Sequence, residues 1–327
     1  MSNHSGALAA NTPLNGEASS ARGTLLIKFG NITDNVLDAG GIVHSGLSVT
    51  LQSCLIERNH LSMVDARASL MFLLVADYDD AVVLSMNSVR FAGNSGPMWT
   101  SILLLGQMAS ADMVDCVFEN NMAGGIAVLA QGDHQPVTTL RCPVTMQASR
   151  WTNNTALSNS FGIFFLQGSL YTSAELLVQI TGSVFQNNNA SLGGGIRLVN
   201  LMNGGTKVTI SESQFLTNAA EDSGGAVMIE GSVETDPLQQ PGVILGVKNV
   251  SFVGNCASGS GGAIDVTGGV YALTCENCSF ISNSAGVNGG AVSVLDTRRN
   301  APIANFTLRN CTFDSNVAAF GAGGAIS

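Results

Sequence analysis

The chain has 327 residues, of which 45% are hydrophobic and 11% charged, and 38 of them are glycine. It is too apolar for a disordered protein, while an aromatic share of 6% is low for a thick globular core. The formal net charge is −10 and no basic run extends beyond Arg298-Arg299. We therefore expect no nucleic-acid partner, because phosphate binding needs clustered Lys and Arg.

The ends of the chain set the expected domain boundaries. Residues 1–20 lack the charged start and apolar core of a signal peptide, and we expect residues 1–24 to form a disordered or capping tail. The longest apolar run, residues 69–76, is much shorter than the roughly 18 residues that cross a bilayer, so no membrane span is expected in this chain. Residues 25–327 should form one domain. Since the last residues, GGAIS, stop inside a repeated pattern, we expect a domain truncated at its C-terminal end, as a piece of a longer protein.

From residue 25 onward the sequence consists of ten repeat units. Each unit has an aromatic or aliphatic anchor, called position 0, and an asparagine three residues later. The anchors are Ile32, Ile56, Phe91, Phe118, Trp151, Phe185, Phe215, Phe252, Phe280 and Phe313. Positions −7 and −5 are hydrophobic in all ten units, against a background of 45%, so the repeat is not an artefact of how the anchors were chosen.

The elements of one unit follow from this pattern in chain order. Positions −7 and −5 alternate like a strand with one buried face, as do positions −2 and 0, and the three-residue step between −5 and −2 predicts a corner. Position −3 is Ser, Asp, Asn or Gly in seven units, which suits a tight or left-handed turn. A Gly pair such as Gly261-Gly262 permits a further bend or a close backbone approach, and a third strand follows it.

Three short strands with corners between them predict an all-β fold, a single-stranded parallel β-helix of about ten coils. Each coil should rise by ~4.8 Å, the spacing of neighbouring strands. Identical positions then stack on one another, and stacked asparagine amides can bond to each other at a buried corner. The asparagines expected to form this structural ladder are Asn188, Asn218, Asn255, Asn283 and Asn316.

The cysteines raise the question of a disulfide. Cys278 and Cys311 both hold position −2 in consecutive coils, so their Cα atoms should lie ~4.8 Å apart, within the range that a disulfide accepts. The alternative is a pair of stacked free thiols that pack as small apolar groups. Cys275 and Cys278 form a lone CxxC without a second pair or histidine partners, so no zinc site is expected.

Asn-x-Ser/Thr sequons provide candidate glycosylation sites. They begin at Asn3, Asn31, Asn153, Asn189, Asn249, Asn277, Asn305 and Asn310. Their number indicates a glycoprotein. The alternative is that the repeat itself creates the sequon at Asn249, Asn277 and Asn310, where a corner Asn precedes an inward residue and an outward Ser or Thr.

The pattern Phe-x-x-Asn followed by Gly-Gly-Ala-Ile/Val resembles the repeats of chlamydial polymorphic outer-membrane proteins and similar repeats in surface proteins of algae and other protists. Over residues 185–327 it occurs as FQNN, FLTN, FVGN, FISN and FDSN before Gly-rich turns. The resemblance implies a surface-exposed, right-handed β-helix of the pectin-lyase-like type, often adhesive, and therefore an extracellular or cell-surface location.

Length variation concentrates at one corner of the unit. The insertions at 131–143, 230–242 and 295–302 all follow the third strand, and loops that leave a solenoid from one corner form one edge, commonly the binding face. The expected partners are extracellular glycans or proteins. The leading hypothesis is a non-enzymatic surface or secreted β-helix for adhesion or scaffolding, with no cofactor and no metal.

The alternative hypothesis is a polysaccharide lyase or glycoside hydrolase on the same fold. Its candidate residues are Asp34, Asp79, Asp80 and His44. Asp79 and Asp80 are adjacent, so on a strand they would point to opposite faces and could not act as a pair, and solvated acidic loops are the preferred interpretation. A third idea, ice binding, lacks a regular Thr-x-Thr column.

Overall fold

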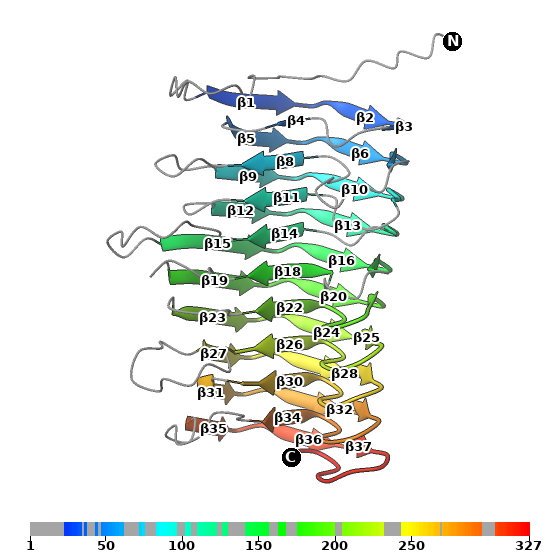
Figure 1. Ribbon diagram of the computed structural model, residues 1–327, viewed down its shortest axis with the longest axis vertical. Coiled ribbons are helices and arrows are strands. Elements are labelled where there is room, and N and C mark those ends of the chain that lie inside the picture. The colour runs from blue at the N-terminus through cyan, green and yellow to red at the C-terminus, as the bar shows by residue number, and fades with distance from the viewer. Residues whose placement is uncertain are drawn as a thin grey trace.

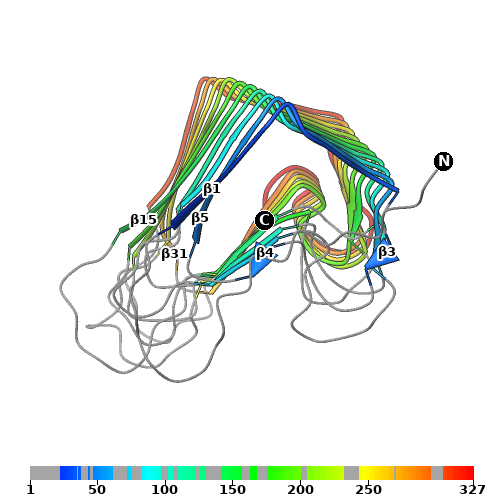
Figure 2. The ribbon, with the colours of Figure 1, turned by 90° about the horizontal axis from the view of Figure 1, so that it is seen from above.

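The computed structural model describes residues 23–34, 36–37, 43–44, 47–61, 72–75, 83–96, 102–105, 110–122, 126–129, 141–156, 163–167, 175–199, 205–231, 243–268, 270–295 and 305–327. Within these ranges all regular structure is β-strand, and every paired strand is parallel to its neighbours (Figure 1). The expected parallel β-helix is confirmed. Seen from the N-terminal end, the chain turns clockwise as it recedes, so the helix is right-handed (Figure 2).

The first sheet has ten strands and carries positions −7 and −5 of every unit. Its strands are β1 (Gly23–Lys28), β5 (Leu47–Gln52), β9 (Val83–Asn87), β12 (Ser110–Val114), β15 (Arg141–Gln147), β19 (Glu175–Thr181), β23 (Thr206–Ser211), β27 (Val243–Lys248), β31 (Val270–Glu276) and β35 (Asn305–Arg309). β1 begins two residues before the expected boundary at residue 25, and the expected N-terminal tail lies otherwise outside the described residues.

The second sheet also has ten strands and carries the anchors. Its strands are β2 (Asn31–Thr33), β6 (Leu55–Glu57), β10 (Arg90–Ala92), β13 (Val117–Glu119), β16 (Arg150–Thr152), β20 (Val184–Gln186), β24 (Gln214–Leu216), β28 (Ser251–Val253), β32 (Ser279–Ile281) and β36 (Thr312–Asp314). In-register pairing places each anchor on the next, as in Phe215↔Phe252↔Phe280.

The third sheet follows the Gly pair and closes the coil. Its strands are β4 (Val43–His44), β8 (Phe72–Val75), β11 (Ile102–Leu105), β14 (Ile126–Leu129), β18 (Phe164–Gln167), β22 (Ile196–Val199), β26 (Val227–Glu230), β30 (Ile264–Thr267) and β34 (Val292–Leu295).

Two-residue strands directly after the repeat asparagine were not expected. They form a fourth sheet of β17 (Thr155–Ala156), β21 (Asn189–Ala190), β25 (Ala219–Ala220), β29 (Cys256–Ala257), β33 (Ser284–Ala285) and β37 (Val317–Ala318), and a separate pair of β3 (Val36–Leu37) and β7 (His60–Leu61). The expected three strands per unit are therefore four in many coils, because a strand of two residues is too short to show an alternating pattern.

Left-handed residues form both corners of the second sheet. Position −3 has a φ between 49° and 59° in all ten units, including Phe29, Ala148 and Glu212, which are not typical turn residues. The other corner, at position +2, is also left-handed, as at Asp34, Arg58 and Asn153. The coil geometry thus imposes this conformation even on residues that resist it, since stacking of whole coils outweighs a local cost of about 1–2 kcal/mol.

The Gly pair performs two different tasks, which Gly261 and Gly262 illustrate. Gly261 has a φ of 65°, which strongly favours glycine. A Cβ on Gly262 would lie 2.1 Å from the carbonyl oxygen of Gly290 in the next coil, so this position has no room for a side chain. The pair therefore allows the turn to bend and the coils to stack at strand spacing.

Stacked aromatic rings fill the interior. The rings of Phe185, Phe215, Phe252, Phe280 and Phe313 follow one another with centroids 4.8–5.0 Å apart and interplanar angles of 2–11°. The first four of these are fully buried. The ring spacing equals the coil rise that strand pairing dictates, so one aromatic column supports the coils from Phe91 onward, while Ile32 and Ile56 hold the same position in the first two coils.

Candidate functional site

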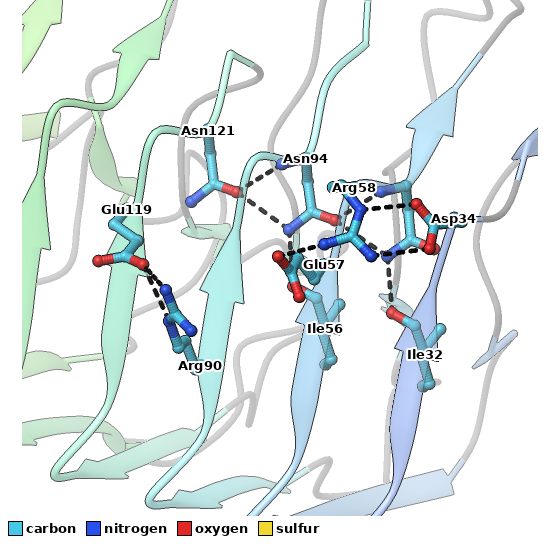
Figure 3. Close-up of polar contacts among 10 residues, drawn as sticks. Ile32, Asp34, Ile56, Glu57, Arg58, Arg90, Asn94, Glu119 and Asn121 are labelled. Carbon is cyan, nitrogen blue, oxygen red and sulfur yellow. Dashed lines mark hydrogen bonds and ion pairs between the residues drawn. The ribbon is translucent and has the colours of Figure 1, made fainter.

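The repeat asparagines form an inner ladder along the buried corner after the second sheet (Figure 3). Asn188 represents the pattern: its Nδ2 donates to Asn218 Oδ1 at 2.9 Å and to the carbonyl of Trp151 at 3.0 Å. Its main-chain N–H also donates to Asn218 Oδ1, at 3.1 Å. The Asn188 side chain is therefore bonded to the coil before it and the coil after it.

The same bonds recur at every expected ladder position and beyond. Asn218, Asn255 and Asn283 repeat them, and Asn316 accepts from Asn283 and donates to Phe280. The ladder also includes Asn59, Asn94, Asn121 and Asn154, which are fully buried. These amides bond to one another and to main-chain carbonyls, as a structural ladder requires.

A second ladder, missed by the sequence interpretation, runs along position −2. The Ser183 hydroxyl donates to the carbonyl of Thr181 at 3.2 Å and accepts from the main-chain N–H of Ser149 at 3.2 Å. Cysteines at this position likewise donate to the carbonyl two residues earlier, as Cys278 does to Glu276 at 3.4 Å. Seven of the ten units have Ser or Cys at this position, and Gly30, Val89 and Val250 interrupt the ladder.

The cysteine pair that was a candidate disulfide consists of free thiols in the structure. Cys278 and Cys311 lie in consecutive coils at equivalent positions, since Ser279 pairs with Thr312. Cys311 Sγ instead donates to the carbonyls of Cys275 at 3.4 Å and Arg309 at 3.3 Å. In-register side chains on one face point the same way, and both thiols are used as donors in the position −2 ladder.

The candidate catalytic residues do not form a described acid–base pair. Asp34 is exposed and accepts two bonds from Arg58, at 2.7 and 2.8 Å, which lower the pKa of its carboxyl group (Figure 3). Arg58 also contacts Glu57, so one guanidinium holds two carboxylates. Asp79, Asp80 and the side chain of His44 lie outside the described residues. Among the described residues there is no group of three or more His, Cys, Asp or Glu that could hold a metal ion.

An open polar groove lies at the corner between the first and second sheets. Its volume is about 340 Å³ and it spans three coils. The polar side chains that line it include those of Glu212, Gln214, Asn249, Ser251, Asn277 and Ser279. Because Gln214, Ser251 and Ser279 are in-register partners, a polar side chain returns at this position in each of the three coils of the groove.

Bonds between the coils order the floor of this groove. Asn310 Nδ2 donates to Asn277 Oδ1 at 3.3 Å, Asn277 Nδ2 to Asn249 Oδ1 at 3.0 Å, and Asn249 in turn to Glu212. Ser279 Oγ donates to Ser251 Oγ at 3.1 Å. The groove therefore presents amides, hydroxyls and one carboxylate. The sequence interpretation treated position −3 only as a turn and so did not predict it.

The candidate glycosylation sites divide by their contacts. Asn249, Asn277 and Asn310 belong to the groove floor, and Asn153 Nδ2 donates to Asn120 Oδ1 at 3.3 Å. Asn31, Asn189 and Asn305 have exposed side chains, whereas Asn3 lies outside the described residues. Glycosylation at any of these positions stays a prediction.

The long insertions all connect the third sheet to the first. β14 ends at Leu129 before β15 begins at Arg141, β26 ends at Glu230 before β27 begins at Val243, and β34 ends at Leu295 before β35 begins at Asn305. Most of each insertion lies outside the described residues. Their attachment points nevertheless lie along one edge of the helix, as the length variation predicted.

The comparisons with known proteins agree with the repeat described above. The model of the Chlamydia polymorphic membrane protein repeat matches residues 249–267, which run from the corner at Asn249 through β28, β29 and the Gly pair to the end of β30. No curated protein and no solved structure matches the chain. Across its described part, the chain has no helix long and apolar enough to cross a membrane. The sequence resemblance is thus confirmed over this part of one coil: residues 249–267 are similar to the Chlamydia polymorphic membrane protein repeat.

Proposed function

We propose that this chain is a non-enzymatic, surface-exposed β-helix that serves adhesion or scaffolding outside the cell or at its surface. The match of residues 249–267 to a repeat of polymorphic membrane proteins supports a surface location. Binding by such a protein needs no cofactor and no metal, because it depends on an exposed, repetitive face.

The observation that carries the proposal is the division between inside and outside. The repeated polar residues of the interior are bonded to the main chain or to each other, as Asn188 and Ser183 illustrate. Groups that could meet a partner lie outside, in the corner groove and along the edge where the insertions attach. This arrangement suits a protein that is recognised by its surface rather than one that encloses a substrate.

Neutral glycans are the partner that the groove fits best. Amides and hydroxyls both donate and accept, so they match the hydroxyl groups of a sugar chain. The formal charge of −10 and the carboxylate of Glu212 disfavour anionic polymers. A glycan that lies along the helix axis would meet similar groups in the three coils that the groove spans. The insertions on the other edge are the proposed contact for protein partners.

A glycan array tests this proposal, run with protein from a host that adds no N-glycans. The probes are neutral oligosaccharides of increasing length, and the variants are Gln214→Ala in the groove and Gln179→Ala on the exposed face of the first sheet as a control. We expect retention of neutral oligosaccharides that falls at least fivefold for Gln214→Ala and is unchanged for Gln179→Ala.

The same preparations, incubated with soluble polysaccharides and assayed for new reducing ends or unsaturated products, test the alternative. Depolymerisation that is lost on replacing Asp79 or Asp80 would overturn the proposal in favour of a polysaccharide-acting enzyme. Absence of binding to glycans and to cell surfaces alike would contradict the adhesive role.

A further inference from the structure

One buried carboxyl group is used by neither ladder nor by the groove. Asp265 lies in β30 between Ile264 and Val266, which point into the core. Neighbouring residues of a strand point to opposite faces, so Asp265 points outward, yet it is only 1% exposed. A carboxyl group on the outer face of a solenoid strand is normally solvated, so something covers it.

The cover is the Gly-rich turn of its own coil, residues 258–263. A Cβ on Gly261 would lie 2.6 Å from the Cβ of Asp265, which places the turn directly against this side chain. Above and below in the third sheet, Asp265 pairs with Met228 and Ser293. Both of these are also nearly buried, at 7% and 5% exposure. The turn therefore closes over a column of outward-pointing side chains.

The carboxyl group is not fully satisfied under this cover. Asp265 Oδ1 has no hydrogen-bond partner, and the Ser293 hydroxyl is the neighbour that bonds to the group. A buried oxygen without a partner costs free energy when it carries charge, and less when the group is neutral.

The surrounding charges oppose ionisation as well. Asp222, from the corresponding turn of the preceding coil, and Glu230, from β26, are both acidic and both raise the pKa of Asp265. Residues 258–263 contain no ionisable side chain, and β34 contributes only the Ser293 hydroxyl. The guanidinium of Arg197 is bound to both oxygens of Glu230, at 2.9 Å each. Burial is the largest influence, and together these raise the pKa of Asp265 to about 6.

We propose that Asp265 is a proton-operated latch: the neutral carboxyl group holds the turn at 258–263 closed against the third sheet, and loss of its proton loosens that turn. The main-chain bonds of the turn, such as Gly261 N–H to the carbonyl of Asn288 at 2.9 Å, then open more often. The rest of the coil stays formed, because Ile264 and Val266 of β30 pack into the core on the face of the strand opposite to the charge. The surface over β30 would thus be rigid in mildly acidic surroundings and more mobile at neutral pH.

Hydrogen–deuterium exchange of the unmodified chain at pH 5 and pH 7.5 tests the latch, after correction for the intrinsic pH dependence of exchange. If the opened turn returns Asp265 to an ordinary value near 3.9, protection of Gly261, Gly262 and Ala263 should fall about tenfold between the two pH values. The equivalent turn at residues 191–195, whose N–H groups donate to residues 223–226 and not to the turn at 258–263, is the internal control and should not change.

The Asp265→Asn variant removes the titratable carboxyl group and keeps the shape of the side chain, so the turn at 258–263 should be protected equally at both pH values. Equal protection of the turn at pH 5 and 7.5 in the unmodified chain, or a persisting pH difference in Asp265→Asn, would overturn the proposal. A carbon-detected NMR titration of the Asp265 carboxyl group in the unmodified chain gives an independent answer should the variant not fold. A midpoint near 6 supports the latch, and a midpoint near 4 contradicts it.

Discussion

At the scale of the residue, the polar side chains of the interior provide hydrogen-bond partners for main-chain N–H and carbonyl groups at the corners of the coil. The inner-ladder asparagine, as at Asn188, bonds to the coil on both sides, whereas the position −2 donor, as at Ser183, bonds to a carbonyl of its own coil and to an N–H of the preceding coil. The amide and hydroxyl groups are chemically replaceable only by groups that make the same bonds. Single substitutions at these positions therefore test the roles directly.

Replacing Asn283 by Ala should lower the free energy of unfolding by ~1–3 kcal/mol, because it leaves buried donors and acceptors without partners. The affected groups are the Nδ2 and N–H of Asn255, which both bond to Asn283 Oδ1 at 3.0 Å. Chemical denaturation measures the change, with Asn189→Ala at an exposed strand position, where the next coil has Ala219, as control. An unchanged midpoint for Asn283→Ala, or equal losses for both variants, would show that the inner ladder is solvated.

Serine should replace cysteine with little loss of stability at position −2, but not at position −5. Cys278→Ser keeps a donor to the carbonyl of Glu276, a bond that Ser149, Ser183 and Ser213 make in other coils. We expect a change below ~1 kcal/mol, whereas Cys275→Ser should cost about 1–3 kcal/mol, since it buries a hydroxyl at an apolar position. Thermal unfolding of the two variants decides the matter. A larger loss at Cys278 than at Cys275 would contradict the second ladder.

Asp265 should make the whole fold more stable in acid. Its folded-state pKa, about 6, lies above the ordinary value, so the folded protein holds the proton more tightly than the unfolded chain. The resulting stability is present below pH ~4 and is lost as the pH rises through 6, by up to about 3 kcal/mol. Denaturation midpoints at pH 4 to 7.5 measure this trend against Asp265→Asn, which should lack this contribution. An identical pH dependence in the variant would contradict the assignment.

At the scale of the element, the coil is held by close main-chain contact at the Gly pair. Gly262→Ala should cost more than 3 kcal/mol or prevent folding, because the new Cβ would meet the carbonyl oxygens of Gly290 and Ser284 at 2.1 and 2.6 Å. Gly246→Ala, in the first sheet, is the control, since the nearest atom to its Cβ lies 3.9 Å away. Thermal unfolding compares them. Equal stability of the two variants would mean that the coils do not approach each other as closely as described.

The sequence alone predicted the elements in which one kind of residue recurs from coil to coil, and it missed the elements without such a recurrence. The first three sheets follow from apolar alternation, and the inner ladder follows from the asparagine three residues after each anchor. The fourth sheet escaped because strands such as β25 have two residues. The latch escaped because its outward column, Arg197, Met228, Asp265 and Ser293, shares no residue type. The second ladder was hidden because Ser and Cys act alike as donors there.

At the scale of the whole molecule, stacking of in-register coils sets the fold, and the proposed function depends on the outer surface. The aromatic column and both ladders repeat along the axis, so each coil supports the next. The insertions and the groove lie on this scaffold without interrupting it. Changes confined to the outside, such as Gln214→Ala, should therefore leave stability within about 0.5 kcal/mol while altering binding.

A crystal structure of this chain is the measurement that tests the in-register β-helix most directly. The account predicts that the rings of Phe215, Phe252, Phe280 and Phe313 stack with centroids 4.8–5.0 Å apart, and that Asn218, Asn255 and Asn283 are joined by bonds of about 3.0 Å. A slip of one residue between any two of these coils would turn an anchor outward and break the ladder. That result would contradict the account.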